Sequence, residues 1–304
     1  MAWSNDTGWL RQVREAVLPN ELLRWSQDDS GFRSFFDSVD LRGLPVPDVL
    51  TRLSDGAIYF NDLPAMVRAH EARPTRHVLL TVSSGNWGAF SNALPNRTVD
   101  WGDWAAAMAQ AGCSVERVVR YLDDPKVLGV VATNHSAIRH PKIIYLPVGV
   151  PLNTPIEKHL RAGDGTKTAE LMINSSDWQH RAAINQAVIA NFGGSLRNSY
   201  GLSIGRYYQE LLASKFLLCP SGFGWDTYRI WEALCLGTIP IVERSPGWDS
   251  LLDDLPALIV GGFEQVTPQL LSWAHPEIMA QRSRFNFSKL TRQYWVDRIT
   301  ARLS

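Results

Sequence analysis

The hydrophobic and polar positions of the chain form a pattern in which strand-like runs alternate with helix-like segments. Short, mostly apolar runs are typical of strands that are covered on both faces of a parallel sheet. They occur at 56–60, 77–82, 128–133, 140–149, 170–174, 215–219, 238–242 and 257–260. Apolar positions at helical spacing occur at 8–25 (divided by Pro19), 63–72, 103–113, 207–213, 269–274 and 289–303. This alternation predicts an α/β protein with doubly wound parallel sheets.

The length of the chain and one polar segment predict two domains. A chain of 304 residues is long enough for two cores of ordinary size. Residues 150–168 are rich in Pro, Gly and polar side chains, which is typical of a connection between domains. We therefore expect an N-terminal α/β domain over 1–150, a linker over 151–168 and a second α/β domain over 169–284. The terminal segment 285–304 is expected to be a helix that packs back on the N-terminal domain.

Composition narrows the classes of partner and the compartment. Thirty basic residues balance thirty acidic ones, which argues against nucleic acid or an anionic membrane as the partner. Cys113, Cys219 and Cys235 are scattered, so they supply neither a disulfide framework nor a metal cluster. The N-terminus lacks the charged and apolar regions of a signal peptide, and no run reaches the length of a transmembrane helix. We expect a cytoplasmic protein without a transmembrane segment.

The most informative stretch, 214–242, predicts a strand, a glycine turn, a helix and a second strand. The first strand is 215–219, and the turn Pro220–Gly224 contains two glycines, which are free to adopt backbone angles that other residues avoid. Asp226 stands where the N-cap of the helix is expected, and Gly237 is expected to be the C′ residue that ends it.

This arrangement predicts a phosphate site. A helix that opens from a glycine turn presents unpaired backbone N–H groups and a partial positive charge. Arg229 lies in the first turn and can bind phosphate oxygens, and Glu232 on the same face can accept hydrogen bonds from ribose hydroxyls. An exposed ion pair between Arg229 and Glu232, next to an ordinary turn, fits the same spacing. The spacing alone therefore does not decide between a phosphate site and a surface ion pair. No Walker A or dinucleotide-binding motif occurs.

The same stretch resembles the C-terminal signature of the exostosin family (glycosyltransferase family 47) and its bacterial and viral relatives. That signature is a strand ending in C-P-x-G-x-G, followed by D-[TS]-x-R-x-x-E-A-L-x-x-G-x-I-P-[IV]. The matching residues are Cys219, Pro220, Gly222, Gly224, Asp226, Thr227, Arg229, Glu232, Ala233, Leu234, Gly237, Ile239, Pro240 and Ile241. Ser221 and Tyr228 depart from it, because relatives often carry Arg and His there. Losing a basic residue next to the phosphates weakens donor binding or changes the donor. A weaker match covers 131–151, and the resemblance extends over roughly 128–303.

The resemblance implies a GT-B fold, with two Rossmann-like parallel-sheet domains facing a cleft. The second domain would hold a nucleotide-sugar, here a UDP-sugar, and the N-terminal domain would hold a glycan or another hydroxyl acceptor. Arg181 matches an arginine of the family, although it also fits a helix-surface position. No D-x-D occurs, so we expect neither a metal nor a cofactor besides the donor. The predicted donor-binding residues are Arg181, Ser221, Gly222, Phe223, Gly224, Asp226, Thr227, Arg229 and Glu232.

Polar residues just past the first strands supply candidates for the acceptor side, because ligands bind at that edge of open α/β sheets. These candidates are Ser83, Ser84, Asn86, Trp87 and Asn134. An inverting transfer, usual in the family, needs a general base, for which His135 ranks first, ahead of Asp62 and Asp103. Two other functions remain open: an NDP-sugar epimerase on the same plan, and a non-catalytic nucleotide-sugar- or glycan-binding relative.

Overall fold

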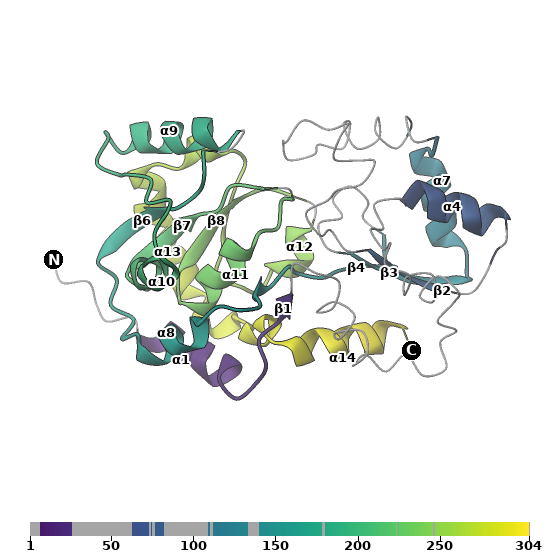
Figure 1. Ribbon diagram of the computed structural model, residues 1–304, viewed down its shortest axis with the longest axis horizontal. Coiled ribbons are helices and arrows are strands. Elements are labelled where there is room, and N and C mark those ends of the chain that lie inside the picture. The colour runs from purple at the N-terminus through teal and green to yellow at the C-terminus, as the bar shows by residue number, and fades with distance from the viewer. Residues whose placement is uncertain are drawn as a thin grey trace. The chain divides into compact units, whose positions relative to one another are not determined.

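The computed structural model describes residues 7–25, 63–72, 74, 77–81, 109, 112–132, 140–177, 180–222, 224–245 and 247–303. The chain divides into two compact units, neither of which is one continuous segment (Figure 1). The first unit comprises Met1–Trp25 and Val148–Tyr294, and the second comprises Ser26–Pro147 and Trp295–Ser304. The expected division at residue 150 therefore differs from this one at both ends of the chain.

The first unit is built on a four-stranded parallel sheet in the order β6-β7-β8-β9, in which β6, β7 and β8 are labelled in Figure 1. The strands are β6 (Ala169–Ile173), β7 (Ser214–Leu218), β8 (Ile239–Glu243) and β9 (Leu258–Val260). All five residues of β7 are buried, because the strand has a neighbour on each side and is covered on both faces. The four runs predicted for this part of the chain are confirmed as strands.

Helices connect and cover these strands. They are α9 (Arg181–Asn191), α10 (Ile204–Leu212), α11 (Tyr228–Cys235), α12 (Trp248–Leu251) and α13 (Pro268–Ala280). The Ser203 hydroxyl caps α10 by accepting a bond from the Arg206 N–H at 3.4 Å. Gly237 follows α11 with φ of +71°, which confirms its predicted place as the C′ residue.

The N-terminal helix α1 (Thr7–Val17) belongs to the first unit, although the expected division placed it in the N-terminal domain. Its apolar face is buried and packs on the short helix η3 (Phe287–Leu290); the Trp9 and Phe287 ring centroids are 6.0 Å apart. Arg14 Nε also donates to the Leu160 carbonyl at 2.8 Å. These partners are distant in sequence, so a division of the chain by segments could not reveal them.

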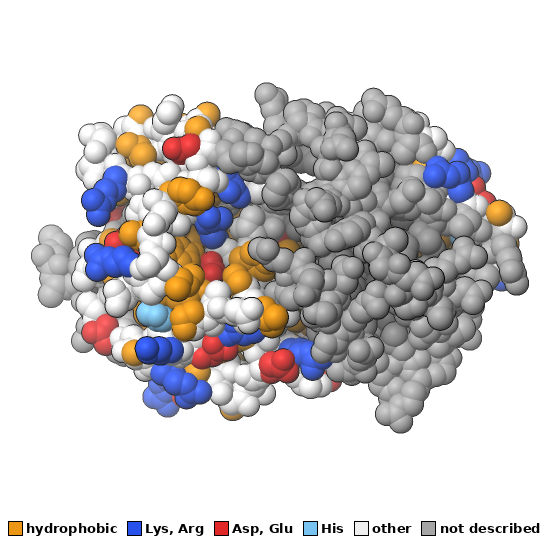
Figure 2. All heavy atoms as spheres, viewed as in Figure 1, with side chains coloured by type: hydrophobic (Ala, Val, Ile, Leu, Met, Phe, Trp, Pro, Cys, Tyr) orange, Lys and Arg blue, Asp and Glu red, His pale blue; other side chains and the backbone are white. Residues whose placement is uncertain are grey.

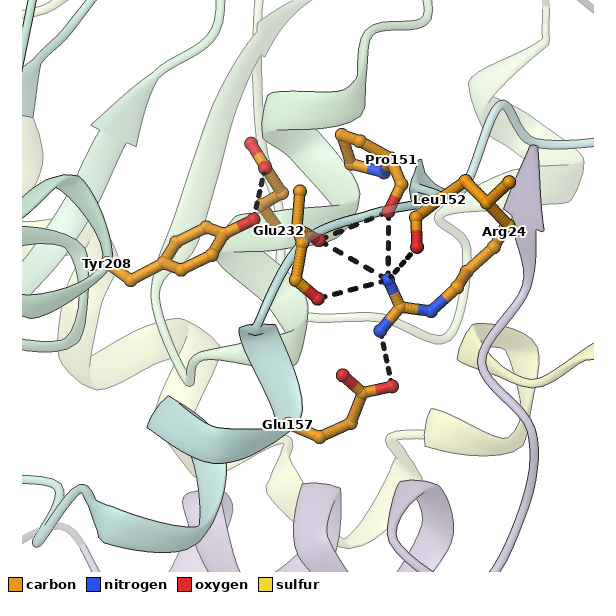
Figure 3. Close-up of polar contacts among 7 residues, drawn as sticks. Arg24, Pro151, Leu152, Glu157, Tyr208 and Glu232 are labelled. Carbon is orange, nitrogen blue, oxygen red and sulfur yellow. Dashed lines mark hydrogen bonds and ion pairs between the residues drawn. The ribbon is translucent and has the colours of Figure 1, made fainter. Parts of the chain in front are cut away.

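The segment expected as a linker, 151–168, is packed into the first unit through helix α8 (Ile156–Ala162), whose apolar side chains are buried. The short strands β1 (Arg24–Trp25) and β5 (Val150–Pro151) pair in parallel. Arg24 Nη1 donates to the carbonyls of Pro151 and Leu152 at 2.9 and 3.0 Å, and Nη2 forms an ion pair with Glu157 (Figure 3). Arg24 therefore fastens this segment to β1.

The second unit contains a three-stranded parallel sheet in the order β2-β3-β4. Its elements are α4 (Leu63–Ala72), β2 (His77–Thr81), α7 (Val115–Asp123), β3 (Val127–Ala132) and β4 (Ile143–Tyr145). Residues 295–303 of α14 (Arg292–Leu303) belong to this unit, where Arg302 donates to the Pro141 carbonyl. The predicted strand 56–60 and most of the predicted helix 103–113 lie outside the described residues.

Together the two sheets confirm the predicted mixed α/β class with parallel strands. The shorter elements that complete the described chain are η1 (Phe263–Gln265) and η2 (Arg282–Arg284). In the part of the chain that the structure describes, no helix is long and apolar enough to cross a membrane. Positive and negative side chains are interspersed on the surface coloured in Figure 2, in keeping with the balanced composition.

Candidate functional site

The loops after β6 and β7 lie at one edge of the first unit's sheet. The two strands are parallel neighbours, and Ile173 at the end of β6 is paired with Leu218 at the end of β7. The loop after β6 leads into α9, and the loop after β7 leads into α11. This carboxyl edge is where open α/β sheets bind ligands, and it brings together most of the described donor-site candidates.

Arg181, the first residue of α9, lies against the loop that follows β7. Its side chain is 8% exposed, its Nε donates to the Ser221 carbonyl at 2.8 Å, and its Nη1 donates to Ser176 Oγ at 3.2 Å. A Cβ added to Gly222 would lie 2.6 Å from Nη2 of Arg181. The buried guanidinium is therefore in place because residue 222 has no side chain.

The role of Gly222 in the turn differs from the conformational one that the sequence indicated. Gly222 is not among the described glycines with positive φ, so this position does not require a backbone angle that other residues avoid. At Gly222 the requirement is space for Arg181 rather than conformational freedom.

Arg229 supplies a second positive charge at the same edge. It stands in the first turn of α11, and its Nε donates to the Asn174 carbonyl at 2.7 Å. Burial, and after it the positive charge of Arg229, lowers the pKa of Arg181 to about 10. Within the described part of the chain, neither guanidinium forms an ion pair with a carboxylate. Two neighbouring cations beside a helix N-terminus form an environment that favours an anion.

His180 completes the basic side of the loop, and sequence reasoning missed it. Its Nε2 lies 3.0 Å from Ser221 Oγ, and Ser221 is buried. Burial, and then the charge of Arg181, lowers the pKa of His180, which favours the neutral ring at pH 7. Ser221 replaces the basic residue expected from the family, yet Arg181 brings a positive charge to it from the start of α9, and the His180 ring contacts its hydroxyl.

Asp226 does not cap α11, so that prediction was wrong. The N-cap is Thr227, whose side chain makes no capping bond. Asp226 is buried; its Oδ1 accepts from Trp231 Nε1 at 2.7 Å, and its Oδ2 accepts from the Val148 N–H at 2.8 Å. Burial raises the pKa of Asp226 to about 7, and these hydrogen bonds oppose the rise. Its carboxylate is used to hold the chain near residue 148.

Glu232 is also buried, at 5% exposure, and is bonded to two tyrosines of α10. Its Oε1 accepts from Tyr208 Oη at 2.8 Å, as drawn in Figure 3, and its Oε2 accepts from Tyr207 Oη at 3.0 Å. Burial raises the pKa of Glu232, and the two phenols oppose the rise. Its burial excludes an exposed ion pair with Arg229, which was the alternative interpretation of their spacing.

The described edge thus brings together Arg181, Ser221, Gly222, Thr227 and Arg229. The structure also describes Gly224, whose carbonyl accepts from the Gly222 N–H at 2.8 Å. Phe223 and the catalytic and acceptor-side candidates lie outside the described residues: His135, Asp62, Asp103, Ser83, Ser84, Asn86, Trp87 and Asn134. Among the residues that are described, no group of three His, Cys, Asp or Glu is placed to hold a metal ion.

Comparison with known proteins supports a glycosyltransferase-type domain here. Residues 179–249, which include most of this edge, match the family model described as the RXYLT1 C-terminal domain, an exostosin-like xylosyltransferase family. The predicted resemblance is confirmed at this level, whereas membership of glycosyltransferase family 47 stays a prediction. No curated protein matches the chain significantly.

Two solved glycosyltransferase structures are similar to the chain at low level. One is AviGT4, a glycosyltransferase involved in avilamycin A biosynthesis, at 12% identity over 62% of this chain and 76% of that one, with a TM-score of 0.33. The other is the spinosyn rhamnosyltransferase SpnG complexed with spinosyn aglycone, at 14% identity over 90% and 79%, with a TM-score of 0.30. At such TM-scores neither similarity carries an argument about this chain.

Proposed function

We propose that the chain is a glycosyltransferase that moves a sugar from a nucleotide-sugar, in the first instance a UDP-sugar, to a hydroxyl of a glycan or another acceptor. The observation that carries this proposal is the pair Arg181 and Arg229, beside the N-terminus of α11 and without a carboxylate partner in the described part of the chain. The family match to a xylosyltransferase-type domain over the same residues supports it.

The arginine pair suits a diphosphate for an energetic reason. Burying a guanidinium next to a like charge lowers stability, and an anion bound between the two removes that cost. Arginine can bind phosphate oxygens in a bidentate manner, and the main-chain N–H groups at the start of α11 add donors. Thr227 Oγ1 is buried and has no hydrogen-bond partner among the described residues, so it is available as a further donor.

The same groups fit the chemistry of transfer. The bond from the anomeric carbon to the diphosphate breaks as the acceptor oxygen attacks, and negative charge grows on the leaving diphosphate. Fixed positive charges and N–H groups stabilise that charge as it develops, which a metal ion does in other enzymes. We therefore propose a metal-independent reaction, in which treatment with EDTA leaves the rate unchanged.

The remaining roles in the proposal come from the sequence. Inversion at the anomeric carbon needs a general base for the acceptor proton, and His135 remains the first candidate, before Asp62 and Asp103. The acceptor is assigned to the second unit, which contains most of the expected N-terminal domain. The donor is assigned to the carboxyl edge of the first unit's sheet, as in a GT-B enzyme. Glu232 binds the ribose in this proposal: its hydrogen bond from Tyr207 or Tyr208 is replaced by one from a ribose hydroxyl.

The test measures binding and turnover in the same protein. Full-length chain is titrated with UDP and GDP by calorimetry and incubated with UDP- and GDP-sugars while free nucleoside diphosphate is followed. Release of the diphosphate is expected; conversion of the sugar without release would indicate an epimerase, and binding alone a non-catalytic relative.

Variants of Arg229 locate the site. Arg229→Ala is expected to weaken UDP binding at least tenfold, and Arg229→Lys to restore part of it, because lysine keeps the charge but not the bidentate geometry. Arg206→Ala is the control, since that exposed arginine pairs with Glu210 on α10. Equal UDP affinity in Arg229→Ala and Arg206→Ala would refute the proposed phosphate site.

A further inference from the structure

Tyr200 lies in a segment that is hydrogen-bonded to the end of strand β6. The Ser199 N–H donates to the Ile173 carbonyl at 2.8 Å, and Asn174 Nδ2 donates to the Ser199 carbonyl at 2.8 Å. The Tyr200 N–H donates to Asn198 Oδ1 at 3.2 Å, and Asn198 itself forms a parallel bridge with Ile173. The backbone that leads into Tyr200 is therefore fixed relative to the sheet.

Asn174 also connects the Tyr200 segment to Arg229 of the arginine pair. The Asn174 carbonyl accepts from Arg229 Nε at 2.7 Å, while its side-chain amide holds the residue before Tyr200. The Tyr200 phenol is also among the groups that act electrostatically on the Arg181 guanidinium. The Tyr200 segment thus borders the site at which we place the diphosphate.

The Tyr200 side chain differs from the other tyrosines near the site in its exposure. It is 60% exposed, whereas Tyr207 and Tyr208 are 6% and 0% exposed and bind Glu232. Within the described part of the chain, the Tyr200 ring makes no aromatic contact and its hydroxyl makes no hydrogen bond. An exposed aromatic ring on a backbone that is hydrogen-bonded to the sheet is a surface on which a flat ligand can stack.

We propose that Tyr200 is the stacking surface for the nucleobase of the donor. This inference rests on the proposed function, because it is the diphosphate on Arg181 and Arg229 that brings the nucleoside to this edge. Stacking is tolerant of base identity, since every base has a π-face. Tyr200 therefore contributes affinity for nucleotides in general, and the choice between uracil and guanine is made by other groups.

The experiment compares a ligand that has a base with one that has none. Wild-type protein and Tyr200→Ala are titrated with UDP and with inorganic pyrophosphate by calorimetry. Tyr200→Ala is expected to weaken UDP binding by about 5- to 150-fold, the range that stacking on one aromatic side chain gives, and to leave pyrophosphate binding within about twofold. Tyr200→Phe keeps the ring and is expected to bind UDP within about twofold of wild type.

Trp273→Ala provides the matched control, because Trp273 is an aromatic residue of α13 with a similar exposure of 63%. Unchanged UDP affinity in Tyr200→Ala would overturn the inference. An equal loss of UDP and pyrophosphate would also overturn it, since the segment would then position the arginines rather than stack on the base. Wild-type protein that binds pyrophosphate as tightly as UDP overturns the stacking role alone, and binding of neither overturns the proposed function as well.

Discussion

A single methyl group at Gly222 is expected to disable the phosphate site while the fold persists. In Gly222→Ala the new Cβ would lie 2.6 Å from Nη2 of Arg181, about 1 Å closer than an ordinary contact of about 3.5 Å. The backbone can accept alanine, because Gly222 is not among the described glycines with positive φ. The guanidinium is therefore the group that must move.

The size of the effect follows from what Arg181 loses. Its displacement weakens bonds to the Ser221 carbonyl and to Ser176 Oγ, which are partly replaced by water at the loop surface. We expect a loss of no more than about 2 kcal/mol in the free energy of unfolding, because alanine also lowers the entropy of the unfolded chain. Removing a charge-assisted contact to phosphate costs about 1.5–3 kcal/mol, or roughly 10- to 150-fold in the dissociation constant for UDP.

Calorimetric titration with UDP and urea unfolding of the apo protein measure the two quantities separately. Gly205→Ala is the control, since a Cβ at that position of α10 meets nothing within 4 Å. It is expected to keep wild-type affinity and to gain up to about 1 kcal/mol of stability. Wild-type UDP affinity in Gly222→Ala would show that Arg181 does not contact the ligand, and the phosphate-site reasoning would fail.

Two further predictions concern buried charges. The folded-state pKa of Asp226, raised by burial from 3.8 to about 7, means that its contribution to stability is full below about pH 4 and is lost as pH rises through 7, by at most about 4 kcal/mol. Asp226→Asn cannot titrate, so it should flatten the dependence of urea unfolding on pH between 5 and 8; an unaltered slope would contradict this. Lys289, which is 2% exposed, pairs with Asp253 and bonds to main-chain carbonyls, so Lys289→Met is expected to destabilise the protein by about 1–3 kcal/mol. Equal melting temperatures for this variant and wild type would refute that role.

The parts of the fold that the sequence predicted are those encoded locally. The run from β7 to β8 was recognisable because the apolar residues that end β7, a glycine turn and the C′ residue Gly237 follow closely in sequence. The roles of Asp226 and Glu232 were not predictable in this way. Asp226 binds the main chain 78 residues earlier, and Glu232 binds tyrosines 24 and 25 residues earlier. Only the tertiary structure brings such partners together.

For Arg181, the sequence left two roles open and the structure decides between them. Its position suggested either a phosphate contact or an ordinary surface arginine, and spacing alone could not decide. The structure buries it against Gly222 and beside Arg229, so the surface interpretation is excluded. His180 was not predicted because nothing in its sequence surroundings indicates a contact with Ser221. That contact forms only in the folded chain.

The division of the first unit between the two ends of the chain has a consequence for synthesis on the ribosome. Helix α1 packs against η3, which emerges about 270 residues later. At roughly 5–20 residues per second, its buried face waits on the order of 10 to 60 s for that partner. Until η3 has been synthesised, Trp9, Leu10, Val13 and Val17 form an apolar stripe available to chaperones. Helix α1 is thus synthesised well before η3, which completes its native contacts.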